Sequence, residues 1–486
     1  MTERETRNSN ETETGTSASK SVSRREFLKI AGIAGATVGV AGGLGGLLAA
    51  CGGTEESTTT TAAGTSSTAG GETTTSVGGE TTTSASTGAE MAGEVKCGYV
   101  VPLTGAMAQF GAAAKWQVDW MNANVWKDGL VCGDGKAYKI NAMIGDSQSD
   151  SNRSAQVAAD LINNEGISLI GGSSSAANVI PVRDTAESFE CPGIYYDCPG
   201  DAWGSSLTEP LKWNWCAWWV GKDVVGNFLG MWEKVPNNKV VGALWENTAD
   251  GANFANVLPG LFQELGYTLS DPGMYPVGTE DYSAIINQFK KDGVEIVCGM
   301  ATSSDFSNFW KQAVQQGFKP PISTVAKALL FPDGVNALGD LGDGMTVEAW
   351  YHPTYPYKSD VTGMTPQQYC DQYEADTGLQ WTQPVCFIGC FELWTDVLRR
   401  TMNPMDKNSI VEAIKATKVT ATGGPVDWTT NPDPVSGYYN FCTKPIAGGQ
   451  WVKGTGKWPY DLVIPVSATH PDIPVGAEMK AVQYPA

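Results

Sequence analysis

The chain has 486 residues, 42% of them hydrophobic, and because single cores rarely grow past about 250–300 residues, two lobes are expected. Its 52 acidic residues outnumber the 32 basic ones, and a field of that sign argues against nucleic acid and anionic headgroups as partners. Only two histidines and no Cys-x-x-Cys occur, so neither a zinc site nor any cofactor is expected.

Residues 1–50 are predicted to be an export signal. Arg24 and Arg25 precede an apolar, glycine-rich run that ends in small residues before Cys51. The arginine pair resembles a twin-arginine signal, and the sequence "LAAC" resembles a lipobox, after which the cysteine is lipidated. We therefore expect Cys51 to anchor an extracytoplasmic protein to the cell membrane.

Residues 51–93 form the next predicted unit, the lipidated cysteine and its linker. The stretch consists largely of Thr, Ser, Gly, Glu and Ala, and such a composition cannot bury enough apolar surface to offset the entropy of ordering. It is predicted to be a disordered tether, with the globular part starting near Glu94.

Ten further cysteines follow Cys51. Several occur in apolar, strand-like runs, where a free thiol packs as a small hydrophobic group. Cys191 and Cys198 flank the short segment "CPGIYYDC", and the oxidising location permits a disulfide between them. A local disulfide and two free thiols both remain possible for this pair.

From Glu94 the pattern alternates between strands and helices. "VKCGYVVPL" and "KINAMIGD" are predicted strands, and a helix with Trp116, Trp120 and Met121 at helical spacing separates them. "SNRSAQVAADLINNEG" predicts a helix that begins at a Ser/Asn cap, before the strand "ISLIGG". The alternation predicts parallel pairing with crossover helices.

The same alternation restarts after residue 220. "KVVGALWEN", "VEIVCGM" and "PISTVAK" are strands separated by amphipathic helices. The predicted fold class is therefore α/β, with two doubly wound parallel-sheet lobes. In such sheets a ligand binds outside the carboxyl ends of the strands, which here would lie between the lobes.

Small and polar residues follow several predicted strands and are candidate ligand contacts. Hydroxyls and free backbone N–H groups at a helix start suit an acceptor-rich ligand, although each of these residues could equally be a helix cap. The candidates are Thr104, Gln109, Ser173, Ser174 and Ser175 in the first lobe, and Asp250 and Thr302 in the second.

The stretch "LKWNWCAWWVGKD" holds four tryptophans in seven positions. Trp213 and Trp215 alternate with other residues at the period of a half-buried strand and are predicted core. Trp218 and Trp219 break that period where the chain would cross between lobes, so we expect them to contact a planar or cyclic ligand, with Tyr195 as a neighbour.

These segments together resemble the type I periplasmic binding proteins of the branched-chain amino acid, amide and urea group. The resemblance runs from Glu94 to about Pro445 and includes the Asp146–Asp150 motif "DSQSD" and the serines after "LIGG". It implies a two-lobed flytrap with three crossings, near Trp218, Trp350 and Pro434. Lobe 1 would comprise residues 94–217 and 351–434, and lobe 2 residues 218–350 and 435–486.

The resemblance also implies a function, which is to deliver a small solute to the permease of an ABC importer, as a monomer. Family members hold a ligand carboxylate with the serines, here Ser173 to Ser175, and an ammonium with acidic groups of the second lobe. Our alignment instead puts Lys222 or Asp223 at the first acidic position, and Ala326 or Lys327 at the second. A lysine beside an ammonium would cost about 1–4 kcal/mol. A small carboxylate or an aromatic or amide-type compound is thus expected, rather than a branched-chain amino acid.

An enzyme is not expected, since no G-x-S-x-G or phosphate loop occurs and a Ser-His-Asp triad would have to use His352. A sensing lipoprotein, which reports its ligand to a membrane partner, remains the alternative to a transport protein.

Overall fold

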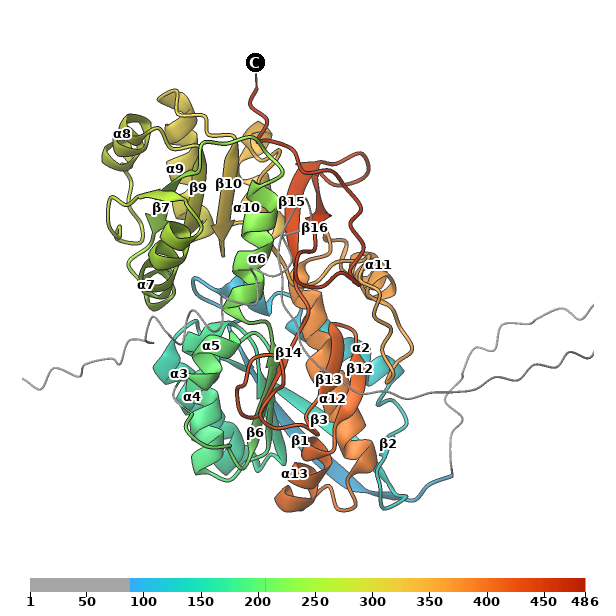
Figure 1. Ribbon diagram of the computed structural model, residues 1–486. Helices are drawn as coiled ribbons and strands as arrows, with labels where there is room; N and C mark the ends of the chain where they lie inside the picture. Colours follow the sequence, from blue (N-terminus) through green and yellow to red (C-terminus); the bar gives the residue numbers. More distant parts are fainter. Residues whose placement is uncertain (1–87, 206, 486) are drawn as a thin grey trace, which may run out of the picture. The chain divides into compact units, whose positions relative to one another are not determined.

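The computed structural model describes residues 88–205 and 207–485. The predicted export signal, Cys51 and most of the linker lie outside the described residues. Two seven-stranded sheets, each with helices packed against it, form the two lobes, as the sequence predicted (Figure 1).

The first sheet is parallel except for β2, which pairs antiparallel with β3 at one edge. Its strands, in spatial order, are β14 (Phe441–Thr443), β6 (Asn214–Trp218), β5 (Gly193–Tyr195), β4 (Leu169–Gly172), β1 (Met91–Val101), β3 (Ala137–Asp146) and β2 (Leu130–Val131).

Helices from both halves of the chain cover the first sheet. α3 and α4 pack on one another, and α12 packs on α2, so a segment near residue 390 lies beside one near residue 120 (Figure 1). The helices of this lobe are α2 (Ala114–Asn124), α3 (Ser151–Asp160), α4 (Ser175–Ser188), α5 (Gly200–Gly204), α11 (Pro366–Thr377), α12 (Ile388–Arg400) and α13 (Lys407–Lys415). A small hairpin of β12 (Lys418–Ala421) and β13 (Gly424–Asp427) follows α13.

The second sheet has a parallel core and an antiparallel edge made by β15 and β16. Its spatial order is β16 (Tyr460–Val466), β15 (Ala447–Lys453), β11 (Thr346–Ala349), β10 (Ile322–Ala326), β9 (Ile296–Met300), β7 (Val240–Trp245) and β8 (Thr268–Ser270). Its helices are α6 (Gly221–Trp232), α7 (Ala249–Glu264), α8 (Ser283–Asp292), α9 (Ser303–Gln315) and α10 (Pro332–Asn336).

The chain passes between the sheets after β6, after β11 and after β14. The third crossing corrects the expected boundary near Pro434, because β14 pairs with β6 and thus belongs to the first sheet. Lobe 1 therefore continues to Thr443, and the residues that follow enter the second sheet at β15. Strand pairing over three residues is too short a signal to read from sequence.

One further expectation is corrected. Asp150, not a Ser or Asn, caps α3, since its carboxylate accepts a hydrogen bond from the backbone N–H of Arg153. Of the two alternatives left open for Cys191 and Cys198, the structure has two free thiols, which are buried and each donate to the carbonyl of the following proline. Trp213 and Trp215 are buried, as predicted.

Candidate functional site

Polar side chains gather just beyond the carboxyl ends of the parallel strands in both sheets. Ser173 follows β4, Asp197 follows β5, Glu246 follows β7 and Lys327 follows β10. Asp197 lies near enough to Asp250 and Glu348 of the second lobe for their charges to raise its pKa. The two sets of strand ends therefore meet, and we treat this region as the candidate site.

The turn after β4 carries the three predicted serines. Ser173 accepts a hydrogen bond from the Tyr99 hydroxyl (2.7 Å), and the Ser174 hydroxyl accepts from the Asn178 amide (3.4 Å). The Ser175 hydroxyl is buried without a hydrogen-bond partner among the described residues. Ser174 and Ser175 have φ of 101° and 56°, a left-handed backbone that costs a serine about 1–3 kcal/mol and is tolerated mostly at functional sites.

Asp197 faces this turn from the end of β5. It is 4% exposed, and burial raises its pKa well above the usual range, although hydrogen bonds from the backbone N–H groups of Ser175 and Ser174 favour its charged form. Its Oδ2 has no hydrogen-bond partner in the described protein, and its φ is 55°. A buried carboxylate thus already uses the N–H groups that the sequence analysis assigned to a ligand.

Lys327, Glu246 and Asp250 form an ion cluster in the second lobe. The Lys327 ammonium lies 2.7 Å from Glu246 Oε1 and 3.6 Å from Asp250 Oδ2. Gly251 lets the start of α7 pack against the end of β7, because a Cβ at that position would lie 1.9 Å from the carbonyl oxygen of Glu246. Glu246 is fully buried, and its Oε2 has no hydrogen-bond partner among the described residues.

Glu348 is the acidic residue of β11. It is 5% exposed, and burial raises its pKa to about 8. Its Oε2 has no hydrogen-bond partner among the described residues. The raised pKa and the unpartnered oxygen mean that no positive side chain of the described protein pairs with this carboxyl group.

Aromatic rings join the two lobes beside these carboxylates. Trp218 lies 4.8 Å from Trp350 and 6.4 Å from Trp219, measured between ring centroids, and Trp350 also contacts Phe110. Tyr196 contacts Trp218 from the adjacent strand. The indole nitrogens of all three tryptophans are buried donors without partners in the described protein. Trp218 continues β6 rather than breaking its period, yet it reaches the place between the lobes that the sequence predicted.

Four predicted residues have other contacts. Thr104 donates to Asp146 Oδ2, within a loop that Asp146 holds by accepting also from the Leu103 N–H. Thr302 caps α9 by accepting from the Asp305 N–H. Tyr195 donates to Asn214 inside the first lobe, whereas Gln109 lies partly buried in the short turn before Phe110. The structure therefore does not bring Thr104, Thr302 or Tyr195 to the unpartnered carboxylates.

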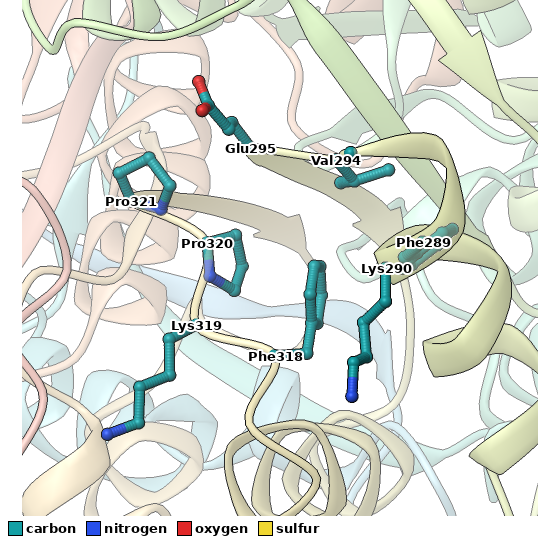
Figure 2. A pocket seen from close by; sticks show the side chains of 9 residues that line it. Phe289, Lys290, Val294, Glu295, Phe318, Lys319, Pro320 and Pro321 are labelled. Atoms are coloured by element: carbon teal, nitrogen blue, oxygen red, sulfur yellow. The ribbon is translucent and has the colours of Figure 1, made fainter.

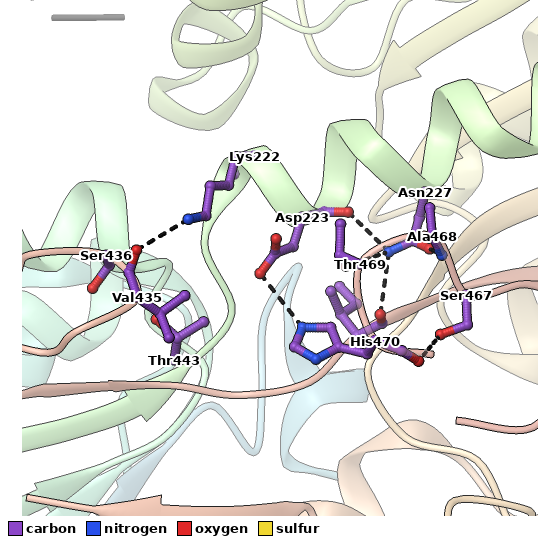
Figure 3. Close-up of polar contacts among 12 residues, drawn as sticks. Lys222, Asp223, Asn227, Val435, Ser436, Thr443, Ser467, Ala468, Thr469 and His470 are labelled. Atoms are coloured by element: carbon purple, nitrogen blue, oxygen red, sulfur yellow. Dashed lines mark hydrogen bonds and ion pairs between the residues drawn. The ribbon is translucent and has the colours of Figure 1, made fainter. Parts of the chain in front are cut away.

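Lys222 and Asp223 are found at the crossing after β6 instead of beside Asp197. Figure 3 shows the Lys222 ammonium directed at the carbonyl oxygen of Val435 (3.0 Å) and the Asp223 carboxylate facing the His470 ring (3.5 Å). Asn227 of the same helix donates to the Ile446 carbonyl, between β14 and β15, and accepts from the Ala468 N–H, after β16. Only the contact with Ile446 joins α6 to a crossing segment.

A separate groove opens at the amino ends of the parallel strands in the second sheet. Figure 2 shows Lys290, Phe318, Pro320 and Pro321 around it, near the residues that precede β9 and β10. The amino ends of parallel strands do not carry the polar residues described above, so we do not assign the site to this groove.

His352, the residue that a catalytic triad would need, is engaged elsewhere. Its ring nitrogens hydrogen-bond with the Leu462 carbonyl and the Thr354 hydroxyl, both at 2.8 Å. Burial lowers its pKa to about 4, so the ring is neutral near pH 7. It packs against Trp381 rather than against a serine.

Sequence reasoning missed Asp197, Glu246, Glu348 and Trp350 as site residues. The first two immediately follow strand-like runs, in "GIYYD" and "GALWE", and that position was the available signal. Glu348 and Trp350 had none, because the strand "TVEA" is short and its direction in the sheet is decided by pairing with β10 and β15.

Comparison with known proteins agrees with the fold. The family model for periplasmic binding proteins matches residues 94–442, so this chain belongs to the periplasmic binding protein family. The family consists of extracytoplasmic proteins that bind solutes for transport and not of enzymes. Within the described residues, no helix is long and apolar enough to cross a membrane.

Individual relatives are similar at low identity. A Leu/Ile/Val-binding protein homolog of Brucella abortus is 26% identical over 299 residues, covering 59% of this chain and 71% of the relative. A leucine-binding protein of Thermotoga maritima superposes with a TM-score of 0.60 at 16% identity, over 76% of this chain and 99% of that one. A Rhodopseudomonas palustris ABC-transporter solute-binding protein, solved with 4-hydroxybenzoate, superposes with 0.62 at 17% identity, over 78% and 98%.

Proposed function

We propose that this protein is a membrane-anchored lipoprotein that captures a small solute between its two lobes and delivers it to the permease of an ABC importer. The observation that carries the proposal is the convergence of unpartnered buried polar atoms at the facing strand ends: Ser175 Oγ, Asp197 Oδ2, Glu246 Oε2, Glu348 Oε2 and three indole N–H groups. Leaving such groups unpaired costs about 1–3 kcal/mol each, and a ligand between the lobes would supply their partners.

The mechanism is a hinge with an open and a closed state. A solute shifts the chain toward the closed state only if it makes more contacts there, and the candidate site provides this because its polar groups come from both sheets. The three crossing segments are the hinge. Because Asn227 of α6, the helix that follows the first crossing, donates to the Ile446 carbonyl in the third crossing, these two segments would move as one unit.

The residues favour an aromatic or amide-type solute among those expected. Trp218, Trp219, Trp350 and Phe110 supply flat apolar surface on which a ring can stack. The leucine or isoleucine type of ligand is less favoured, because Lys327 stands near the acidic pair that would face an ammonium.

The proposal is tested by refolding the purified protein free of bound solute and screening it against aromatic acids, amides, amines and amino acids by thermal unfolding. Binding to the folded state raises the midpoint. A compound that raises it should also reduce the radius of gyration in small-angle scattering, because the lobes close. If no compound from any class changes either quantity, the proposed function fails.

A further inference from the structure

The candidate site has more acidic than basic side chains. Asp197, Glu246, Asp250 and Glu348 carry four carboxyl groups, and Lys327 is the one basic side chain in the described part of the chain that forms an ion pair with any of them. The buried Lys444 donates instead to the carbonyl oxygens of Gly424 and Pro425. At least two of the carboxyl groups, Asp197 and Glu348, are left without a positive partner.

The Asp197 carboxyl group lies at the place where a ligand carboxylate would bind. Backbone hydrogen bonds from Ser175 and Ser174, at the start of α4, favour its charged form against the larger effect of burial on its pKa. A ligand carboxylate would compete with Asp197 for these donors and would be repelled by its ionised form, so both the hydrogen-bond and the Coulomb contributions oppose it.

Asp197 and Trp218 belong to neighbouring strand ends. β5 pairs with β6 with Tyr195 opposite Cys216, so Trp218 ends β6 beside the segment that carries Tyr196 and Asp197, and Tyr196 contacts the Trp218 ring. The face of an indole ring attracts a positive charge by about 0.5–2 kcal/mol, depending on desolvation. Carboxylates beside tryptophan faces are therefore suited to a cation that is partly apolar.

A metal ion is a poor candidate for that cation. Among residues 88–205 and 207–485, no three His, Cys, Asp or Glu side chains converge in a way that could hold a metal ion. The carboxyl groups come from both sheets, with Asp197 after β5, Glu246 after β7 and Glu348 in β11, so an organic cation is the better candidate.

We propose that the solute is an organic cation without a carboxylate group, such as a protonated or quaternary amine, with its positive charge held by Asp197 and Glu348 and its apolar part against Trp218 and Trp219. This inference rests on the proposed function and adds the chemical class of the solute. Asp197 takes the position of a ligand carboxylate, so that the protein itself provides the anion.

The test uses the full-length chain, purified from membranes in detergent and refolded to remove bound solute. Matched probes that differ in charge are compared by thermal unfolding and calorimetry: benzylamine and phenyltrimethylammonium as cations, benzyl alcohol as the neutral analogue, benzoate as the anion and leucine as the zwitterion. We expect the cations to raise the unfolding midpoint and the other probes to leave it unchanged. Asp197→Asn should weaken cation binding on the order of tenfold or more.

Asp119→Asn is the matched control, because it removes the same charge from an exposed position on α2 that pairs only with Lys115 among the described residues. It should bind the cations as wild type does. If Asp197→Asn does not fold, Glu348→Gln is measured in its place, and the charge series on the wild-type protein remains decisive.

The outcomes separate the two proposals. Binding of benzoate or leucine in preference to the amines overturns the inference and leaves solute capture intact. Amine binding that is unchanged in both Asp197→Asn and Glu348→Gln overturns it as well, since the charge would then be held elsewhere. A protein that responds to no probe here and to no compound of the wider screen contradicts both.

Discussion

At the scale of single residues, Asp197 shows most clearly how the position of a side chain in the fold decides its role. In sequence it is one acidic residue in an aromatic stretch, "IYYDC". In the structure it is buried at the end of β5 and takes the N–H donors of the serine turn. Left-handed backbone at Ser174, Ser175, Asp197 and Lys327 concentrates strain at the same place, which is typical of binding sites.

Trp219 is expected to contribute to binding more than to stability. It is only partly buried, whereas Trp218 is 2% exposed and packs on Tyr196, Trp350 and Phe387. Trp219→Ala should weaken solute binding about threefold to tenfold at nearly unchanged stability, while Trp218→Ala should also lose about 3–5 kcal/mol through the cavity it leaves. Calorimetric titration and urea unfolding of both variants measure this. Unaltered affinity in both would remove the tryptophans from the site.

Glu348 should make the solute-free protein less stable as pH rises. Burial raises its pKa from 4.5 to about 8, so between these values the folded state keeps a proton that the unfolded state has released. The free energy of unfolding therefore falls with rising pH, by up to about 1.4 kcal/mol per pH unit from this group. In Glu348→Gln the decline between pH 5 and 8 should be smaller, with Asp197 contributing the remainder.

Urea unfolding at several pH values measures the slope. Glu264→Gln, at the exposed end of α7, is the control and should keep the wild-type slope. Equal slopes in wild type and Glu348→Gln would mean that Glu348 is ionised in the folded protein.

At the scale of secondary-structure elements, helix starts position the site. α4 begins at the serine turn, α7 begins with Asp250 in its first turn, and α3 begins at Asp150 directly after the loop that holds Thr104. The helix periodicity of these segments could be predicted from the sequence. Their cap residues were harder to predict, because Ser, Asn and Asp can all cap a helix and several of them occur at neighbouring positions.

Asp150 provides the test at this scale. Removing its carboxylate in Asp150→Ala leaves the Arg153 N–H at the start of α3 without its partner and should lower the free energy of unfolding by about 0.5–2 kcal/mol. Asp150→Asn should retain most of the stability. Asp160→Ala, at the exposed last residue of the same helix, should cost less, because a negative charge there opposes the helix dipole. A neutral effect of Asp150→Ala would show that water replaces the cap.

At the scale of the whole molecule, the lobes depend on segments that are far apart in sequence. β14 pairs with β6 across more than 200 residues, and α12 packs on α2. The candidate site depends on these long-range contacts, because they align the strand ends of both sheets. The proposed membrane anchor, in contrast, would depend on the first fifty-one residues alone.

Cys51→Ala should release the protein from the membrane. Acyl chains contribute about 0.8 kcal/mol per buried CH₂ group, so the unacylated chain has no comparable membrane affinity. Fractionation of cells expressing the variant should move the protein to the soluble extracytoplasmic fraction, and labelled palmitate should enter wild type but not the variant. Ser57→Ala, in the linker, should behave as wild type; a variant that stays in the membrane fraction would contradict the lipid anchor.

The α/β class, the two lobes and the strand ends as the expected ligand position could be predicted from the amino-acid sequence, because hydrophobic periodicity and the polar residues after each strand are local properties. The same patterns pointed to Ser173 to Ser175, Asp250, Trp218 and Trp219. The fold was needed to find that Asp197 lies at the serine turn, that Glu348 and Trp350 join the candidate site, that β14 belongs to lobe 1, and that Lys222 bonds to Val435. Charge, burial and hydrogen-bond partners depend on neighbours brought together across hundreds of residues, and no local pattern encodes them.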